Sequence, residues 1–306
     1  MAERRTTFTE LLDSKKLLVA DGAMGTALFD GGLEPGGSPE LLNVENPELV
    51  RSVHQSYVDA GADIILTNTF GGNGPRFELH KLADRTIELN EAAGAVARLA
   101  AESVDRPVAV AGSIGPTGSL LQPYGLLTVP EAEAAFAEQV TGLVAGGVDV
   151  LWIETMSSLE ELQAAFTAAA ATDLPVVATM SFDSHGHTMM GVHPNTLGKW
   201  AAETPRLTGA GANCGIGPDD IVVAVEGIVA IAPDTIAIAK GNCGVPLYSG
   251  LTMEYPTKPE DMIDYVDRAV AIGARIVGAC CGSTPAHIQA IRERVDQLAR
   301  GDRAEV

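Results

Sequence analysis

Two adjacent cysteines, Cys280 and Cys281, stand at the end of the apolar segment Arg275–Ala279 and are followed by a glycine. The chain has only two other cysteines, Cys214 and Cys243, and each lies in an Asn-Cys-Gly sequence. In a reducing compartment, so few cysteines are more typical of metal binding or catalysis than of structural disulfides. The sequence therefore raises the question of whether several of these thiols meet.

The elements that must position the cysteines form a regular series. Eight short runs of apolar and small residues recur along the chain, each followed by a helical stretch, as expected for parallel strands that are covered on both faces. These predicted strands are Leu17–Asp21, Ala62–Asn68, Pro107–Ser113, Val148–Glu154, Pro175–Ser181, Thr208–Cys214, Asp234–Lys240 and Ala274–Cys280. The series predicts an α/β fold, a single (β/α)8 barrel of the TIM type over residues 1–306, with a doubly wound open sheet as the competing architecture.

Helix boundaries support this reading. Asn46-Pro47 and Thr284-Pro285 each place a capping residue before a proline at the first helical position. The sequences VDAGAD, VAGGVD and VAIGAR repeat one transition from helix to strand, in which a glycine is expected to form a left-handed cap.

All four cysteines fall at the carboxyl ends of predicted strands, where barrel enzymes carry their active sites. Alternate strands of a barrel contribute to the same interior layer, so Cys214 from the sixth strand can meet Cys280 and Cys281 from the eighth. Three convergent thiolates would bind Zn²⁺ and leave one coordination position open, as in catalytic zinc sites. Gly282 supplies the backbone freedom that aims both adjacent sulfurs inward; a strained disulfide between them is the alternative.

Short motifs in a fixed order accompany the cysteines: DGAMGT, TNTF, GPTG, ET, GANCGIGP and GACCGSTPAHI. In this order and spacing the chain resembles the homocysteine S-methyltransferase family along essentially its whole length. The resemblance implies a zinc barrel, an enzyme of the methyltransferase class, that binds homocysteine through its sulfur and methylates it to methionine. By matched positions, Cys214, Cys280 and Cys281 would be the zinc ligands and the catalytic centre.

The same resemblance implies a substrate site. Asp21 and Glu154 would hold the amino group of homocysteine, and the backbone amides around Gly22 and Ala23 would take its carboxylate. Cys243 departs from the family, which usually has alanine or serine there, and we interpret it as an inert small residue. Asn242 is a candidate for the open metal position when substrate is absent.

Elementary chemistry supports a zinc–thiolate reaction. A free thiol has a pKa near 8.5, so little thiolate, the nucleophile, exists at neutral pH. Binding to Zn²⁺ deprotonates the thiol, and two carboxylates beside an ammonium group orient the substrate for in-line displacement.

The methyl donor is less clearly indicated. The segments SFDSHGHTMMGVHP and GNCGVPLYSG look like bacterial betaine–homocysteine methyltransferases, which favours betaine or a related onium compound. Onium groups bind to aromatic faces; Phe70 and Trp152 are our candidates, with Thr69 beside them in the substrate site. However, Gly71 and Thr155 stand where the animal betaine enzymes carry tyrosines.

Four alternatives remain. They are an S-methylmethionine-dependent enzyme, a methyltetrahydrofolate-linked enzyme that needs a corrinoid protein as partner, a non-catalytic zinc-binding barrel, and an aldolase that uses Lys240 as its Schiff-base lysine.

Composition sets the class of partner. The chain has 306 residues and a formal net charge of −20, which argues against nucleic acid or an anionic membrane as partner. It lacks an apolar run of membrane-spanning length and an apolar secretory signal near Met1. We therefore expect a cytoplasmic enzyme that acts on small molecules, with a homo-oligomer left open.

Overall fold

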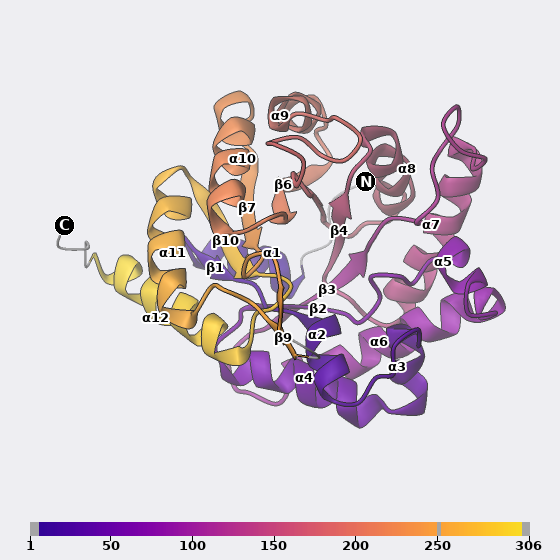
Figure 1. Cartoon of the computed structure of the whole chain (residues 1–306), viewed down its shortest axis with the longest axis horizontal. Coiled ribbons are helices and arrows are strands. Elements are labelled where there is room, and N and C mark those ends of the chain that lie inside the picture. Colours follow the sequence, from indigo (N-terminus) through magenta and orange to yellow (C-terminus); the bar gives the residue numbers. More distant parts are fainter. Residues whose placement is uncertain (1–5, 250–251, 302–306) are drawn as a thin grey trace.

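A parallel sheet of eight strands forms the centre of the computed structural model, which describes residues 6–249 and 252–301 (Figure 1). Its order is β1-β10-β7-β6-β5-β4-β3-β2, and a bridge between Ala20 and Ile64 joins the two ends. The strands are β1 (Leu18–Val19), β2 (Ile64–Leu66), β3 (Ala109–Ile114), β4 (Val150–Met156), β5 (Val176–Met180), β6 (Leu207–Cys214), β7 (Ile236–Gly241) and β10 (Ala274–Ala279). All eight predicted strands and the (β/α)8 barrel are thus confirmed.

Helices surround the barrel and connect consecutive strands (Figure 1). They are α1 (Thr7–Ser14), α2 (Met24–Asp30), α3 (Leu42–Glu45), α4 (Pro47–Asp59), α5 (Gly74–Glu78), α6 (Thr86–Ala101), α7 (Val129–Ala145), α8 (Leu159–Ala170), α9 (Pro194–Ala202), α10 (Pro218–Ile231), α11 (Met262–Ala271) and α12 (Pro285–Arg300), with the short 3₁₀ turns η1 (Pro39–Leu41), η2 (Ala83–Arg85) and η3 (Pro259–Asp261). Within the described part of the chain, no helix combines the length and apolar character needed to cross a bilayer.

The predicted helix signals act as expected. The Asn46 side chain accepts a hydrogen bond from the Leu49 amide at the start of α4. Gly61, Gly147 and Gly273, one in each of the three repeated transitions, all have positive φ, between 78° and 101°. A residue with a Cβ would be strained there, so these glycines set the angle at which each helix returns to the sheet.

Alternation along the strands separates two cores. Val150 and Trp152 of β4 face the barrel interior, while Leu151 and Ile153 pack against the outer helices. Phe8 of α1 belongs to the interior cluster and is fully buried. Because side chains fill the barrel interior below the strand ends, the open end of that interior lies at the carboxyl ends of the strands.

The sequence did not predict a two-stranded antiparallel hairpin in the segment after β7. It consists of β8 (Leu247–Ser249) and β9 (Thr252–Glu254). The hairpin precedes η3 and α11, so the loop after β7 carries secondary structure of its own.

Candidate active site

Three sulfur atoms meet at the carboxyl ends of β6 and β10. The Sγ of Cys214 lies 3.3 Å from that of Cys280 and 3.7 Å from that of Cys281, and all three lie within 4.8 Å of one another. A tetrahedral zinc site with Zn–S bonds of about 2.3 Å requires sulfurs about 3.8 Å apart. The donor set and its spacing therefore fit a zinc ion with three thiolate ligands.

The backbone holds the sulfurs in this arrangement. Cys214 has a φ of 60°, in the left-handed region that non-glycine residues rarely adopt. The Cys280 amide donates to the Gly241 carbonyl at 2.7 Å, and the Cys281 carbonyl accepts from the Cys243 amide at 3.0 Å. Gly282 has a φ of 81°, so the predicted glycine freedom after the cysteine pair is used.

Hydrogen bonds among the sulfurs distribute their protons unequally. These bonds raise the pKa of Cys214 and lower the pKa of Cys281, because one thiolate is stabilised by neighbouring thiols that stay protonated. A second or third thiolate in the same buried space would be repelled by the first. A cation is therefore needed to hold all three sulfurs in the ionised form.

Cys243 does not belong to this group. Its side chain is fully buried, and burial raises the pKa of its thiol to about 12. It is absent from the described metal-ligand cluster. The Asn242 Oδ1 lies 3.8 Å from the Cys214 Sγ, while its Nδ2 donates to the Gly215 carbonyl at 3.0 Å. Asn242 therefore lies beside the metal site, and the Cys243 side chain is buried outside the cluster.

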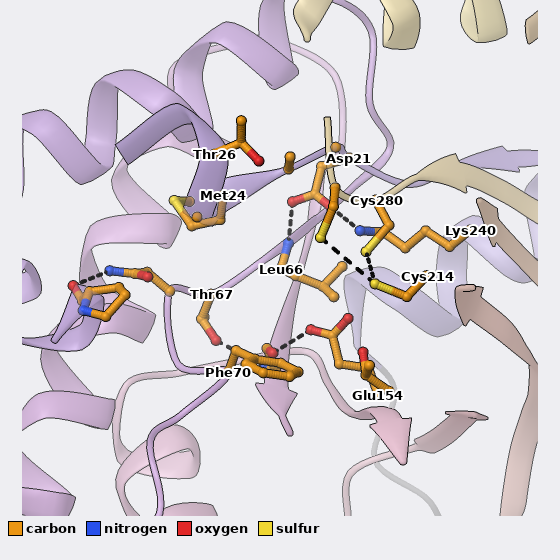
Figure 2. A pocket seen from close by; sticks show the side chains of 18 of the residues that line it. Asp21, Met24, Thr26, Leu66, Thr67, Phe70, Glu154, Cys214, Lys240 and Cys280 are labelled. Carbon is orange, nitrogen blue, oxygen red and sulfur yellow. Dashed lines mark hydrogen bonds and ion pairs between the residues drawn. The ribbon is translucent and has the colours of Figure 1, made fainter. Parts of the chain in front are cut away.

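The sulfurs line a cavity of about 220 Å³ at the mouth of the barrel (Figure 2). Its walls come from the ends of seven of the barrel strands, all except β5, together with the start of α2 and the turn η1. Among the residues that line it are Asp21, Gly22, Ala23, Glu40, Asn68, Phe70, Ser113, Glu154, Cys214, Lys240, Cys280 and Cys281.

Asp21 is one of three buried carboxylates, with Glu154 and Glu40, that share the cavity with the sulfurs. Its Oδ2 accepts a hydrogen bond from the Leu66 amide at 2.7 Å. Its Oδ1 lies 3.1 Å from the Lys240 Nζ as an ion pair, but has no hydrogen-bond partner. Burial raises the pKa of Asp21, an effect that the Lys240 charge opposes. Asp21 thus keeps an acceptor atom available inside the cavity.

Glu154 is the second carboxylate. The Ser113 hydroxyl donates to its Oε1 at 2.5 Å, and the Asn213 side-chain amide lies 3.5 Å from its Oε2. Burial raises the pKa of Glu154 to about 7. In Figure 2 the Glu154 and Asp21 side chains approach the space beside the sulfurs from different strands. An ammonium group between them would be paired with one or two negative charges.

The raised pKa of Glu154 predicts a pH-dependent effect on stability. Since the folded-state pKa, about 7, exceeds the ordinary value, ionised Glu154 destabilises the fold. This cost is absent below about pH 4.5, grows up to about pH 7 and is constant above it. We expect Glu154→Gln to raise the free energy of unfolding of the metal-free, substrate-free protein by about 2–3 kcal/mol at pH 8. Urea unfolding at pH 8 and pH 4.5 measures this; an equal gain at both pH values would contradict it.

The backbone cradle at Gly22 and Ala23 is partly occupied. The Ala23 amide donates to the Ser283 Oγ at 3.0 Å, and the Tyr57 hydroxyl donates to the Ala23 carbonyl at 2.8 Å. A Cβ on Gly22 would lie 2.5 Å from the Ser283 Oγ. These contacts join the loop after β1 to the loop that carries Cys280 and Cys281. They also leave the Ala23 amide without a free proton for a carboxylate.

The three predicted donor-site residues have different positions. Phe70 lines the cavity and is 37% exposed, with the Arg76 guanidinium 5.7 Å from its ring centroid. Thr69 is fully buried and donates to the Ser113 carbonyl at 2.7 Å. Trp152 is fully buried in the barrel interior and does not line the cavity. The structure therefore brings Phe70, but neither Thr69 nor Trp152, to the cavity.

Two charged residues were missed as parts of this cavity. The sequence indicates for Lys240 only the role of a Schiff-base lysine in an aldolase. Burial lowers the pKa of Lys240, but Asp21, Cys280 and Glu154 together raise it above its ordinary value, and a charged amine is not a nucleophile. Glu40 has no predicted role, yet it is buried and accepts from the Gly71 amide at 2.8 Å. The sequence feature that could have indicated Glu40 is an acidic residue between Pro39 and Leu41, in an otherwise apolar turn.

Comparison with known proteins resolves the class of this barrel. The model of the homocysteine S-methyltransferase family matches residues 18–295. The chain belongs to the homocysteine S-methyltransferase family. The three-cysteine cluster and the buried carboxylates thus lie together, at the carboxyl ends of the strands, in a member of this family.

Individual relatives agree with this assignment. The chain is 31% identical to the methionine synthase of Mycobacterium tuberculosis and 29% identical to that of Mycobacterium leprae, covering 99% and 96% of its own length. It spans only about a quarter of those relatives, 27% and 26%. The metallated form of the homocysteine methyltransferase MmuM from Escherichia coli superposes with a TM-score of 0.77 at 27% identity, over 94% of this chain and 99% of that one.

Proposed function

We propose that this chain is a zinc-dependent homocysteine S-methyltransferase that produces methionine. The observation that carries the proposal is the convergence of Cys214, Cys280 and Cys281, with sulfurs 3.3 and 3.7 Å apart, in one cavity with Asp21 and Glu154. A non-catalytic zinc module needs no buried carboxylates beside its metal. The free thiols require a reducing compartment, which supports a cytoplasmic location.

Each group has a separate task. When bound by the three cysteines, zinc would lower the pKa of the homocysteine thiol so that the sulfur is nucleophilic at neutral pH. Asp21 Oδ1 and the Glu154 carboxylate accept hydrogen bonds from the substrate ammonium group. Ser113 holds Glu154 in place at 2.5 Å. Orientation by two fixed acceptors aligns the sulfur for in-line attack on the methyl group.

We further propose that the methyl donor is a small onium compound such as betaine. Glu40, Asp21 and Glu154 place three carboxylates on the walls of the cavity, against one lysine. Phe70, which directly precedes the Gly71 amide that Glu40 accepts from, adds an aromatic face to the cavity. A methyl group on a cationic centre is attracted to this environment, and its transfer to a thiolate cancels charge, which a water-poor site favours.

Glu40 accounts for the absence of the tyrosine that animal betaine enzymes carry at position 71. A Cβ on Gly71 would lie 2.8 Å from the Glu40 Oε1, so a larger side chain would displace the carboxylate. At the other position, Thr155 exchanges two hydrogen bonds with the Asn213 side chain, at 2.8 and 2.6 Å. We infer that a carboxylate and one phenylalanine serve here in place of an aromatic cage.

S-methylmethionine, a sulfonium compound, is the second candidate donor, because it also carries its methyl group on a cationic centre that carboxylates and an aromatic face would attract. A corrinoid route is the third. The cavity, at about 220 Å³, is below the range of about 300–1,000 Å³ typical of drug-sized ligands. A cavity of this size suits small molecules such as homocysteine and betaine.

A donor panel tests this proposal. The zinc-loaded protein is incubated with homocysteine and, in turn, betaine, dimethylsulfoniopropionate, S-methylmethionine, S-adenosylmethionine or methylcobalamin, and methionine is quantified. We expect turnover with betaine and without any partner protein. Turnover confined to methylcobalamin or a methylated corrinoid protein would refute the onium donor but not the zinc–homocysteine site.

Phe70→Leu should weaken donor binding more than homocysteine binding, by about 1–2 kcal/mol.

A further inference from the structure

Lys240 is a buried cation to which the proposed reaction assigns no role. It lies near the end of β7, its side chain is 3% exposed, and it is the only lysine or arginine among the described residues that line the cavity. Figure 2 shows its side chain extending toward Asp21, next to the sulfurs of Cys280 and Cys214. Burying an ammonium group costs several kcal/mol, so its presence requires an explanation.

The barrel is built to let Lys240 reach Asp21. The lysine is on β7 and Asp21 follows β1, and β10 lies between these two strands. Gly278 is the partner of Lys240 in the β10 register, and a Cβ at Gly278 would lie 2.9 Å from the Ala20 Cβ. A glycine at this point therefore keeps the space between the strands free of a side chain. The Lys240 Nζ ends 3.1 Å from the Asp21 Oδ1.

The Lys240 ammonium is incompletely partnered. It has three N–H donors, and Asp21 is the only carboxylate of the described residues within 4 Å of it. A homocysteine molecule held by Asp21 and Glu154 through its ammonium group brings its own carboxylate into the same cavity. The Ala23 amide, which could have bound that carboxylate, already donates to the Ser283 Oγ.

We propose that Lys240 binds the α-carboxylate of the amino-acid substrate. The proposal rests on the proposed function, because it assumes that homocysteine occupies this cavity. An α-amino acid carries its ammonium and carboxylate groups on neighbouring carbons, and Asp21 and Lys240 present the opposite charges side by side. The zwitterion would thus meet a matching pair of charges, which selects amino acids over simple thiols. Lys240 is in this sense a specificity-determining residue.

Two truncated thiols separate the possible roles of Lys240. The compound 4-mercaptobutanoate lacks the amino group of homocysteine, and 3-mercaptopropylamine lacks its carboxylate. Calorimetric titration of the zinc-loaded protein should show that Lys240→Met weakens binding of homocysteine and 4-mercaptobutanoate by about 10- to 150-fold, the effect of losing a charge-assisted hydrogen bond. Binding of 3-mercaptopropylamine should be unchanged or tighter. Asp21→Asn should give the reverse pattern for the two truncated thiols.

Other outcomes overturn the inference. If Lys240→Met weakens 3-mercaptopropylamine as much as homocysteine and spares 4-mercaptobutanoate, Lys240 acts only by holding Asp21. If the variant raises the KM for betaine and leaves homocysteine binding intact, the carboxylate that it recognises belongs to the donor.

A second variant guards against loss of the fold. Because Lys240→Met leaves Asp21 unpaired, the double variant Lys240→Met/Asp21→Asn is compared with Asp21→Asn alone, with zinc content and unfolding temperature recorded for each. The double variant should bind 4-mercaptobutanoate more weakly than Asp21→Asn does. Equal affinity in these two proteins overturns the inference. A wild-type protein that binds zinc but none of the three thiols would refute the proposed function itself.

Discussion

Alanine at Cys214, Cys280 or Cys281 is expected to remove most of the bound zinc and nearly all methyltransferase activity. Each residue supplies one of three sulfurs within 4.8 Å of one another, and structural zinc sites derive a binding free energy of about 10–16 kcal/mol from their full ligand set. Loss of one thiolate should therefore lower zinc affinity by about three orders of magnitude or more. Metal content after dialysis and methionine formation measure the two effects.

Cys243→Ala is the matched control. The Cys243 amide donates to the Cys281 carbonyl, so this cysteine adjoins the same site, and it is fully buried. Its sulfur is outside the cluster, so zinc and activity should both be kept. Loss of zinc from Cys243→Ala as complete as that from Cys214→Ala would mean that the assigned ligand set is wrong.

The second large effect is expected at the two carboxylates. Asp21→Asn and Glu154→Gln should each retain zinc but weaken homocysteine binding by about 1.5–3 kcal/mol, the value of a charge-assisted hydrogen bond. The double variant should lose more than either single variant, because one ammonium group contacts both residues. Calorimetric titration with homocysteine provides the measurement, and Ser113→Ala, which removes only the support of Glu154, should have a smaller effect. Unchanged affinity in both single variants would exclude Asp21 and Glu154 from the substrate site.

The strands and the cysteine cluster could be predicted because both depend on local sequence. A parallel strand covered on both faces is visible as an uninterrupted apolar run, and its carboxyl end then locates the active-site rim. Cys214 and the adjacent pair Cys280 and Cys281 follow such runs directly. Barrel closure, a property of the fold class, brings them together, so no knowledge of loop conformation was needed.

The other parts of the site depend on contacts that local patterns do not contain. Strand alternation correctly predicts that Trp152 and Glu154 share the inner face of β4. Two residues along a strand span about 6.6 Å, however, and this distance places Trp152 in the filled core and Glu154 in the cavity. The bond that occupies the Ala23 amide comes from Ser283, 260 residues away. The pairing of Lys240 with Asp21 crosses an intervening strand. Such facts follow only from the three-dimensional arrangement.

The contact between Ala23 and Ser283 also bears on how the enzyme is made. During translation the loop after β1, which carries Asp21, leaves the ribosome long before β10 and the cysteine pair. The barrel cannot close until both segments have been synthesised. Zinc held by Cys214 at the end of β6 and by the two cysteines after β10 would bind the chain only once these strands lie in one sheet, and would stabilise that state. Metal supply should consequently affect the yield of correctly folded enzyme during synthesis.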